Sequence, residues 1–281
     1  MAQETITMPT GFAVVVRGMK AKEMSLLADE QLMKKAKKGR SPIDPLLTNC
    51  TLEVIDAGPY AGVAVGPGVT VPWSSILLCD RFHALLRVRA CTWGDGYEFK
   101  VRCPNATCSH HEKPFIWEVP LSGLEVKPLP EAMVALVRQG QNWYPLQLGG
   151  KEVHLKILTG ADELRSQRIA GQFDSSEALL AQVASRVLAI EGVKLPKDDR
   201  EQENNLKKII AWVGELEIDE LRTAQDVINE RDGGIETTTK VACPKCEEEF
   251  VIEIPFALQG FLLPDRKKKA EPASTASTTP D

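Results

Sequence analysis

Two pairs of closely spaced cysteines constrain the fold of this chain more than any other feature of its sequence. Cys103 and Cys108 are separated by four residues, Cys243 and Cys246 by two, and a strand-like segment lies on each side of each pair. A short loop between two strands can place two sulfurs on one metal ion, and zinc prefers four thiolate or imidazole ligands in a tetrahedron. We therefore predict one structural Zn²⁺ site, of zinc-ribbon type, whose ligands are all four cysteines.

Other interpretations of these cysteines stay open. A redox CxxC motif opens a helix after a strand, whereas here a strand follows Cys246, and unmetallated thiols are a further alternative. His110 and His111 lie just beyond the wider first pair, so either histidine could replace Cys108 as a ligand. Metal binding between segments so far apart would join the middle of the chain to its end and contribute folding energy.

The surroundings of the first pair recur around the second at an offset of 140 residues. Lys100-Val101-x-Cys103-Pro104 matches Lys240-Val241-x-Cys243-Pro244, and Gly94 matches Gly234. The shared order of the matching segments favours a diverged duplication over coincidence.

The repeat divides the chain into two related halves that meet at the zinc site. We place the first half at residues 1–130, including a Gly/Pro-rich insert, and the second, more helical half at residues 131–265. Residues 266–281 contain no large apolar side chain and are expected to be a disordered tail.

Hydrophobic periodicity predicts an α+β fold for the ordered part of the chain. Residues 41–76 are rich in Pro and Gly and are expected to form short strands only. We expect helices over about 21–38, 78–91, 175–191, 201–214 and 218–231. We expect strands over 10–17, 97–102, 115–121, 153–158, 237–242 and 250–254.

No arrangement of residues typical of an active site accompanies the cysteines. The sequence has no phosphate-binding glycine loop, no Ser/His/Asp set and no H-E-x-x-H motif, and four cysteines would leave a zinc ion no open position. His83 and His154 are expected to pack in a helix and a strand. Cys50, Cys79 and Cys91 are expected to be small buried hydrophobes. We therefore predict a protein that is not an enzyme, with no catalytic residues and no small-molecule substrate. A metal-dependent enzyme is the alternative, and it would need an open coordination position on the metal ion near His110 or His111.

Charge is unevenly distributed along the chain. The net charge is −5, yet residues 17–40 contain eight Lys or Arg and three Asp or Glu, so the remainder sums to about −10. The basic residues at 34–40 fit the solvated last turn of a helix, and no aromatic residues interleave them for base stacking. An acidic protein is a poor general binder of nucleic acid, although a nucleic-acid-binding zinc-ribbon protein is the alternative function.

The sequence also bears on location. No apolar run approaches the roughly 20 residues that a membrane-spanning helix needs, so we expect no membrane partner. The N-terminus carries an acidic residue and lacks the basic start and apolar centre of a secretory signal. The expected compartment is cytosolic, where cysteines are reduced.

A series of short motifs resembles the T-even-type bacteriophage baseplate protein family over roughly residues 8–264. Cys103, Cys243 and Cys246 match the cysteine pattern of the family, whereas Cys108 departs from it by two inserted residues and the Gly/Pro stretch at 56–72 is unusually long. The motifs that carry the resemblance are Ile43-Asp44-x-Leu46-Leu47-x-Asn49-Cys50, Asp80-Arg81-x6-Arg87-x-Arg89, Gly94-Asp95-x-Tyr97-x-Phe99, Leu158-Thr159-Gly160-Ala161-Asp162-Glu163-Leu164 and Cys243-Pro244-Lys245-Cys246 with the following Glu253-Ile254-Pro255-Phe256.

The resemblance implies a virion-assembly factor or a component of the tail baseplate, as in members that act in assembly of the baseplate hub. Its partners would be other phage baseplate and tail proteins. It would act in the host cytoplasm during assembly or in the virion. Apolar-striped helices of the kind predicted here can dock partners, although they also build a protein's own core.

Overall fold

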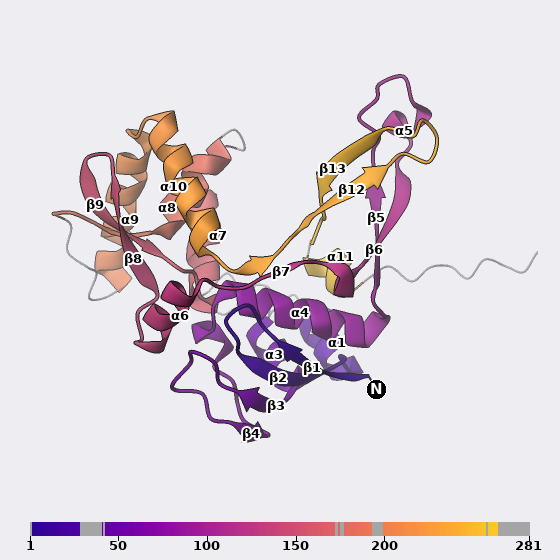
Figure 1. Cartoon of the computed structure of the whole chain (residues 1–281), viewed down its shortest axis with the longest axis horizontal. Helices are drawn as coiled ribbons and strands as arrows, with labels where there is room; N and C mark the ends of the chain where they lie inside the picture. Colours follow the sequence, from indigo (N-terminus) through magenta and orange to yellow (C-terminus); the bar gives the residue numbers. More distant parts are fainter. Residues whose placement is uncertain are drawn as a thin grey trace, which may run out of the picture.

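A computed structural model of the chain describes residues 2–28, 41, 43–171, 174, 177–192, 199–256 and 258–263. It has three parts: an N-terminal sheet with its helices, a helical part around a second sheet, and two hairpins that project from the body (Figure 1). Buried side chains from all three parts form one hydrophobic cluster. The predicted basic segment at 34–40 and tail at 266–281 lie outside the described residues.

The N-terminal part is an antiparallel sheet in the order β1-β2-β3-β4. The β-branched run of β2 favours a strand; four of its five residues are buried, and β1 and β3 pair with its two edges. Helix α4 packs against β1 and β2. The strands are β1 (Gln3–Thr7), β2 (Ala13–Arg17), β3 (Thr51–Asp56) and β4 (Gly66–Pro67), and the helices are α1 (Ala21–Ala28), α3 (Ile43–Cys50), η1 (Trp73–Ser75) and α4 (Leu78–Trp93).

The second part is an antiparallel sheet in the order β10-β9-β8, with helices packed on one another beside it. Gly149 and Gly150 connect β8 to β9 with φ of 59° and 69°, as a two-residue hairpin turn requires. The strands are β8 (Trp143–Leu148), β9 (Lys151–Lys156) and β10 (Val187–Ile190), and the helices are α6 (Glu131–Arg138), η3 (Gly160–Asp162), α7 (Glu163–Ala170), α8 (Ala178–Arg186), α9 (Asp199–Gly214) and α10 (Ile218–Arg231).

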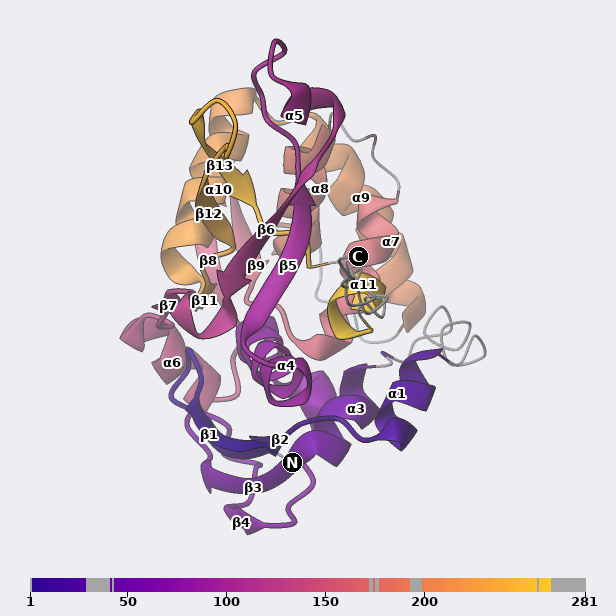
Figure 2. The ribbon, with the colours of Figure 1, turned by 90° about the vertical axis from the view of Figure 1, so that its right-hand side faces the viewer.

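The third part consists of two separate antiparallel hairpins whose tips lie at the same end of the molecule, away from the β1–β4 sheet (Figure 2). Short elements connect the hairpins to the body. The hairpin strands are β5 (Gly96–Val101) with β6 (Phe115–Pro120), and β12 (Thr238–Ala242) with β13 (Glu249–Glu253). Helix α5 (Ser109–Glu112) lies in the loop between β5 and β6, and the connecting elements are η2 (Leu121–Gly123), β7 (Val126–Lys127), β11 (Gly234–Ile235) and α11 (Leu258–Leu262), with β7 paired to β11.

An aromatic cluster fixes the base of the hairpins to α4. Tyr97 of β5 stacks on Phe256 at 5.7 Å between ring centroids and meets Phe261 edge-on at 5.1 Å. Arg89 of α4 lies over the Tyr97 ring at 5.2 Å, and the Tyr97 hydroxyl donates to the carbonyl of Pro255 at 2.6 Å. The chain that leaves β13 is therefore held against the start of β5.

Much of the predicted secondary structure is confirmed. The α+β class, the helices corresponding to α4, α9 and α10, and all four hairpin strands are present at the expected places. The predicted helix over 175–191 is wrong in its second half, because Val187–Ile190 forms β10 and pairs with β9. The expectation of short strands only over 41–76 is also wrong, since α3 lies there.

A buried guanidinium joins three of the motif segments. Arg81 of α4 is 3% exposed and donates to Asp44 of α3, to Glu163 of α7 at 3.2 Å and to the Trp73 carbonyl at 2.8 Å. A Cβ at Gly160 would lie 2.5 Å from an Arg81 nitrogen, so the close approach requires glycine.

None of the helices that the structure describes is long and apolar enough to cross a membrane.

Candidate metal centre

The tip of the β12–β13 hairpin forms a tight cysteine loop. The Cys243 carbonyl accepts a hydrogen bond from the Glu247 amide at 2.9 Å, and the Cys243 amide donates to the Glu248 carbonyl at 2.9 Å. Glu247 closes the turn with φ of 59°, the one positive φ of a non-glycine residue among the described residues. The loop thereby turns Cys243 and Cys246 to the same side.

The tip of the β5–β6 hairpin is a longer loop with its own internal support. The Asn105 side-chain oxygen accepts from the Thr107 amide at 3.0 Å and from its hydroxyl at 2.7 Å, and the Cys108 amide donates to the Asn105 carbonyl at 3.0 Å. The Cys103 amide donates to the carbonyl of His110 at 3.1 Å. These bonds absorb the two extra residues of the first pair and bring Cys108 back beside Cys103.

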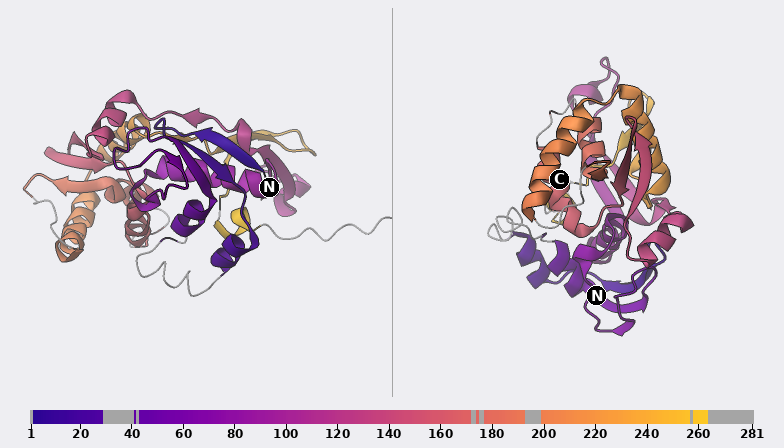
Figure 3. Two further views of the ribbon diagram at one scale, coloured as in Figure 1. Left: turned by 90° about the horizontal axis from the view of Figure 1, so that it is seen from below. Right: turned by 90° about the vertical axis from the view of Figure 1, so that its left-hand side faces the viewer.

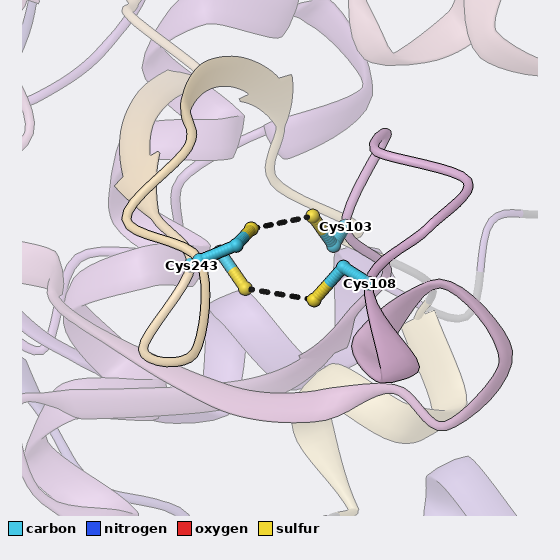
Figure 4. A group of neighbouring side chains, drawn as sticks. Cys103, Cys108 and Cys243 are labelled. Atoms are coloured by element: carbon cyan, nitrogen blue, oxygen red, sulfur yellow. Dashed lines mark hydrogen bonds between the residues drawn. The ribbon is translucent and has the colours of Figure 1, made fainter.

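The two loops face each other across the four predicted ligands. The sulfurs of Cys103 and Cys246 are 3.5 Å apart, and those of Cys108 and Cys243 are 3.8 Å apart (Figure 4). All four sulfurs lie within 4.8 Å of one another. Cys103, Cys108 and Cys243 are buried, and Cys246 is more exposed.

The spacing of the sulfurs fits a tetrahedral metal site. A zinc ion about 2.3 Å from each of four sulfurs leaves about 3.8 Å between sulfurs, within the range found here. Disulfide bonds would require sulfurs about 2.05 Å apart, and all seven cysteines are free. The donor set, four sulfurs from two loops, could hold one soft or borderline ion and would leave it no open position.

Backbone amides assist ionisation of the cysteines. Burial raises the pKa of Cys243, but hydrogen bonds from the amides of Cys246 and Lys245, together with His110, lower it to about 6. Burial, together with the sulfurs around it, raises the pKa of Cys103 to about 12, against a hydrogen bond from the Asn105 amide that lowers it. One thiolate therefore forms readily, while the crowding of further negative sulfurs needs a cation to offset it.

The two histidines after the first pair lie around the cluster and are not part of it. His110 Nδ1 is 3.5 Å from the Cys243 sulfur, a hydrogen-bond contact of the kind that orients a metal ligand. His111 Nδ1 is 2.9 Å from the carbonyl oxygen of Cys103. The four sulfurs come together without either histidine, and Cys108 as the fourth ligand stays a prediction.

The remaining cysteines and histidines lie elsewhere. Cys50 is buried in the core, whereas Cys79 and Cys91 are half-buried. His83 is buried on α4, and His154 of β9 stacks on Trp143 at 4.0 Å between ring centroids. The ammonium of Lys245 donates a hydrogen bond to the Ser109 hydroxyl at 2.8 Å and so joins the two cysteine loops. No signal in the sequence predicts this contact.

The fold and the cysteine cluster define an α+β protein in which two distant hairpins can be joined by one metal ion. Comparison with family models extends this description. The family described as T4 bacteriophage base plate protein matches residues 1–262, and the chain belongs to that family. The match covers nearly the whole chain and includes all four clustered cysteines, which confirms the predicted relationship.

Comparisons with the curated proteins and with the solved structures gave no significant match.

Proposed function

We propose that this chain is a non-enzymatic assembly factor or structural component of the phage tail baseplate, at its hub, and that it acts by protein–protein contacts. Membership of the base plate family over residues 1–262 is the observation that carries this proposal. Its partners are then other baseplate and tail proteins. It meets them in the host cytoplasm during assembly, and its place in the virion is the tail baseplate.

A structural zinc ion is the second element of the proposal. Cys103, Cys108, Cys243 and Cys246 are its ligands, supported by sulfur separations close to those of a tetrahedral site. The ion would supply a cross-link between the two hairpins, which share no strand pairing with each other in the described residues. In this proposal the hairpins are the corresponding parts of two related halves, residues 1–130 and 131–265.

The proposal is tested by replacing the gene in its phage with a variant carrying Cys243→Ser and Cys246→Ser. We expect the purified wild-type chain to contain one zinc per molecule by elemental analysis and the variant to contain none. We expect the variant phage to yield fewer complete baseplates, counted by electron microscopy. Cys91→Ser is the matched control, because Cys91 is a half-buried thiol outside the cluster.

Two results would contradict the proposal at different levels. Complete baseplates formed in normal number without the gene would exclude the assembly role. A wild-type chain that is purified without metal and binds none of zinc, iron or cobalt would exclude the metal site and leave the family role standing.

A further inference from the structure

Helix α5, which follows Cys108, carries side-chain contacts that cross from one cysteine loop to the other. His110 Nδ1 lies 3.5 Å from the Cys243 sulfur, and the Ser109 hydroxyl accepts a hydrogen bond from the Lys245 ammonium at 2.8 Å. Two consecutive residues at the start of α5 therefore contact the tip of the other hairpin, across the same gap that the proposed metal ion would span.

Within the described residues, no sheet joins the two hairpins. Each hairpin is a separate two-stranded sheet, and such a sheet is only marginally stable in water by itself. The β12–β13 hairpin also projects toward the end of the molecule opposite to helices α9 and α10, as the view from below shows (Figure 3). The relative position of the two cysteine loops therefore depends on side-chain contacts between them and on the ion.

Both the backbone and the ring of His110 are held in place. Its carbonyl accepts a hydrogen bond from the Cys103 amide at 3.1 Å. Its half-buried ring packs against the buried ring of Phe115, with 5.1 Å between the ring centroids and 35° between the planes. The ring thus keeps Nδ1 beside the Cys243 sulfur, and little rotamer freedom remains to be lost when the site forms.

The positions of the donor atoms exclude His110 from the predicted ligand set. The ligand atoms around one ion must all lie close to one another. The group whose donor atoms lie within 4.8 Å of one another consists of the four cysteines and does not include His110. His110 is close to one sulfur of the cluster, which is the place of a residue that contacts a ligand and not the metal.

The chemistry of the sulfur determines which atom carries the hydrogen in this contact. A thiolate bound to a metal has no proton, so its hydrogen bond with His110 requires the hydrogen on Nδ1. Four thiolates around one divalent ion leave surplus negative charge on the sulfurs, and an N–H group directed at one of them offsets part of that charge. Outside the four cysteines, His110 supplies the one side-chain hydrogen bond to a clustered sulfur in the part of the chain that the structure describes.

We propose that His110 is a positioning residue of the metal centre: its Nδ1–H group donates to the Cys243 thiolate, keeps that sulfur directed at the ion and so slows release of the metal. The inference rests on the proposed zinc site with its four cysteine ligands. The contact between Ser109 and Lys245 holds α5 beside the second loop, whereas His110 acts on a ligand itself. Loss of such an outer hydrogen-bond partner typically lowers metal affinity by about 10–100-fold.

The experiment uses the full chain loaded with zinc and follows transfer of the ion to an excess of a chromogenic chelator. His110→Phe keeps a flat ring against Phe115 but lacks the N–H group, so zinc should leave about tenfold faster or more than from the wild-type chain. His110→Asn has a side-chain amide N–H near the position of Nδ1 and should restore the rate to within about threefold of wild type. His111→Phe is the matched control and should also stay near the wild-type rate, because His111 Nδ1 contacts the carbonyl oxygen of Cys103 instead of a sulfur.

A spectrum of the cobalt-substituted chain separates a bond to the sulfur from general support of the loop. A hydrogen bond lowers the energy of the sulfur electrons, so its loss in His110→Phe should move the sulfur-to-cobalt charge-transfer band to longer wavelength, and His110→Asn should move it back. Equal zinc release from His110→Phe and the wild-type chain, an unshifted cobalt band, or equal effects of His110→Phe and His111→Phe would each overturn the inference and leave the zinc site standing. A wild-type chain that takes up neither zinc nor cobalt would overturn the zinc site together with the inference.

Discussion

Asp80 and His83, three residues apart on α4, respond to burial in opposite directions. Burial raises the pKa of Asp80 to about 6, although its carboxylate accepts hydrogen bonds from Thr10 at 2.5 Å and from the Tyr60 hydroxyl at 2.7 Å. Burial, with the charge of Arg87 adding to it, lowers the pKa of His83 to about 4. The fold therefore favours the neutral form of both side chains.

The Asp80 shift predicts how its replacement changes stability with pH. Because the folded-state pKa lies above the unfolded value, the stabilisation is present at low pH and is lost as pH rises through about 6. Relative to Asp80→Asn, the wild-type chain should gain about 2 kcal/mol of unfolding free energy between pH 7 and pH 4. Urea unfolding at a series of pH values checks this. A stability difference that does not vary with pH would contradict it.

His83→Gln serves as the control with the opposite sign. The folded-state pKa of His83 is depressed, so its stabilisation is present above about pH 6.5 and is lost as pH falls toward 4. Between pH 7 and pH 4 the wild-type chain should therefore lose unfolding free energy relative to His83→Gln. Over the same pH range it should gain unfolding free energy relative to Asp80→Asn.

Glu247 adopts a backbone conformation that suits glycine better. A left-handed conformation costs an ordinary residue about 1–2 kcal/mol. We expect Glu247→Gly, in the presence of zinc, to raise the unfolding free energy by about 0.5–1 kcal/mol, measured by thermal or denaturant unfolding. Glu249→Gly, at the first position of β13, is the matched control and should lower stability, since glycine loses more backbone freedom on entering a strand than other residues do. Destabilisation by both changes would show that the turn gains nothing from glycine.

At the scale of elements, the two hairpins are described parts of the fold with little sheet pairing of their own. They belong to separate two-stranded sheets, and an isolated two-stranded hairpin is marginally stable in water. Val251 at 62% and Ile116 at 57% exposed show how little apolar cover the hairpins have along their outer faces.

Removal of zinc should therefore loosen the hairpins before the body. We expect chelation to accelerate hydrogen exchange at the amides of β12 and β13 by about tenfold or more, while β2, in the core of the N-terminal sheet, keeps its protection. Exchange measured by mass spectrometry after chelation provides the test, with Cys91→Ser as a variant that should behave like the wild-type chain. Equal exchange with and without metal would rule out the cross-link.

At the scale of the whole molecule, Arg81 holds α3, α4 and α7 together. It lies between Asp44 and Glu163, which are 29% and 26% exposed, and is itself almost fully buried. The contact joins segments 37 and 82 residues away along the chain from Arg81. A buried cation with two carboxylates fixes the relative position of the elements that carry them.

Replacing Arg81 by Met should lower the unfolding free energy by about 2–3 kcal/mol. This cost is smaller than that of removing one member of a fully buried ion pair, because the carboxylates of Asp44 and Glu163 remain partly exposed to water. Urea unfolding near pH 7 measures the change. Arg222→Met removes an exposed ion pair with Asp219 and should cost less than about 0.5 kcal/mol. Equal effects of the two substitutions would mean that the buried network contributes no more than a surface pair.

Local sequence determined the hairpin strands, the long amphipathic helices and the identity of the four clustered cysteines. Strand periodicity, loop spacing and apolar stripes act over a few residues, so β5, β6, α4 and α10 could be predicted without knowledge of the fold. The duplication inferred from the 140-residue offset stays a prediction, as does the zinc ion.

Only the tertiary structure decided the rest, because the deciding contacts lie far apart along the chain. Val187–Ile190 continues a helical stripe in sequence, yet it pairs with β9 as a strand. Arg81 lies in a motif that gives no sign of Asp44 and Glu163 as its partners. The sulfurs of Cys103 and Cys246 meet across 143 positions because the aromatic cluster on α4 sets both hairpins on one side of the body. Spacing can thus single out the four cysteines, but only packing brings their sulfurs to one point.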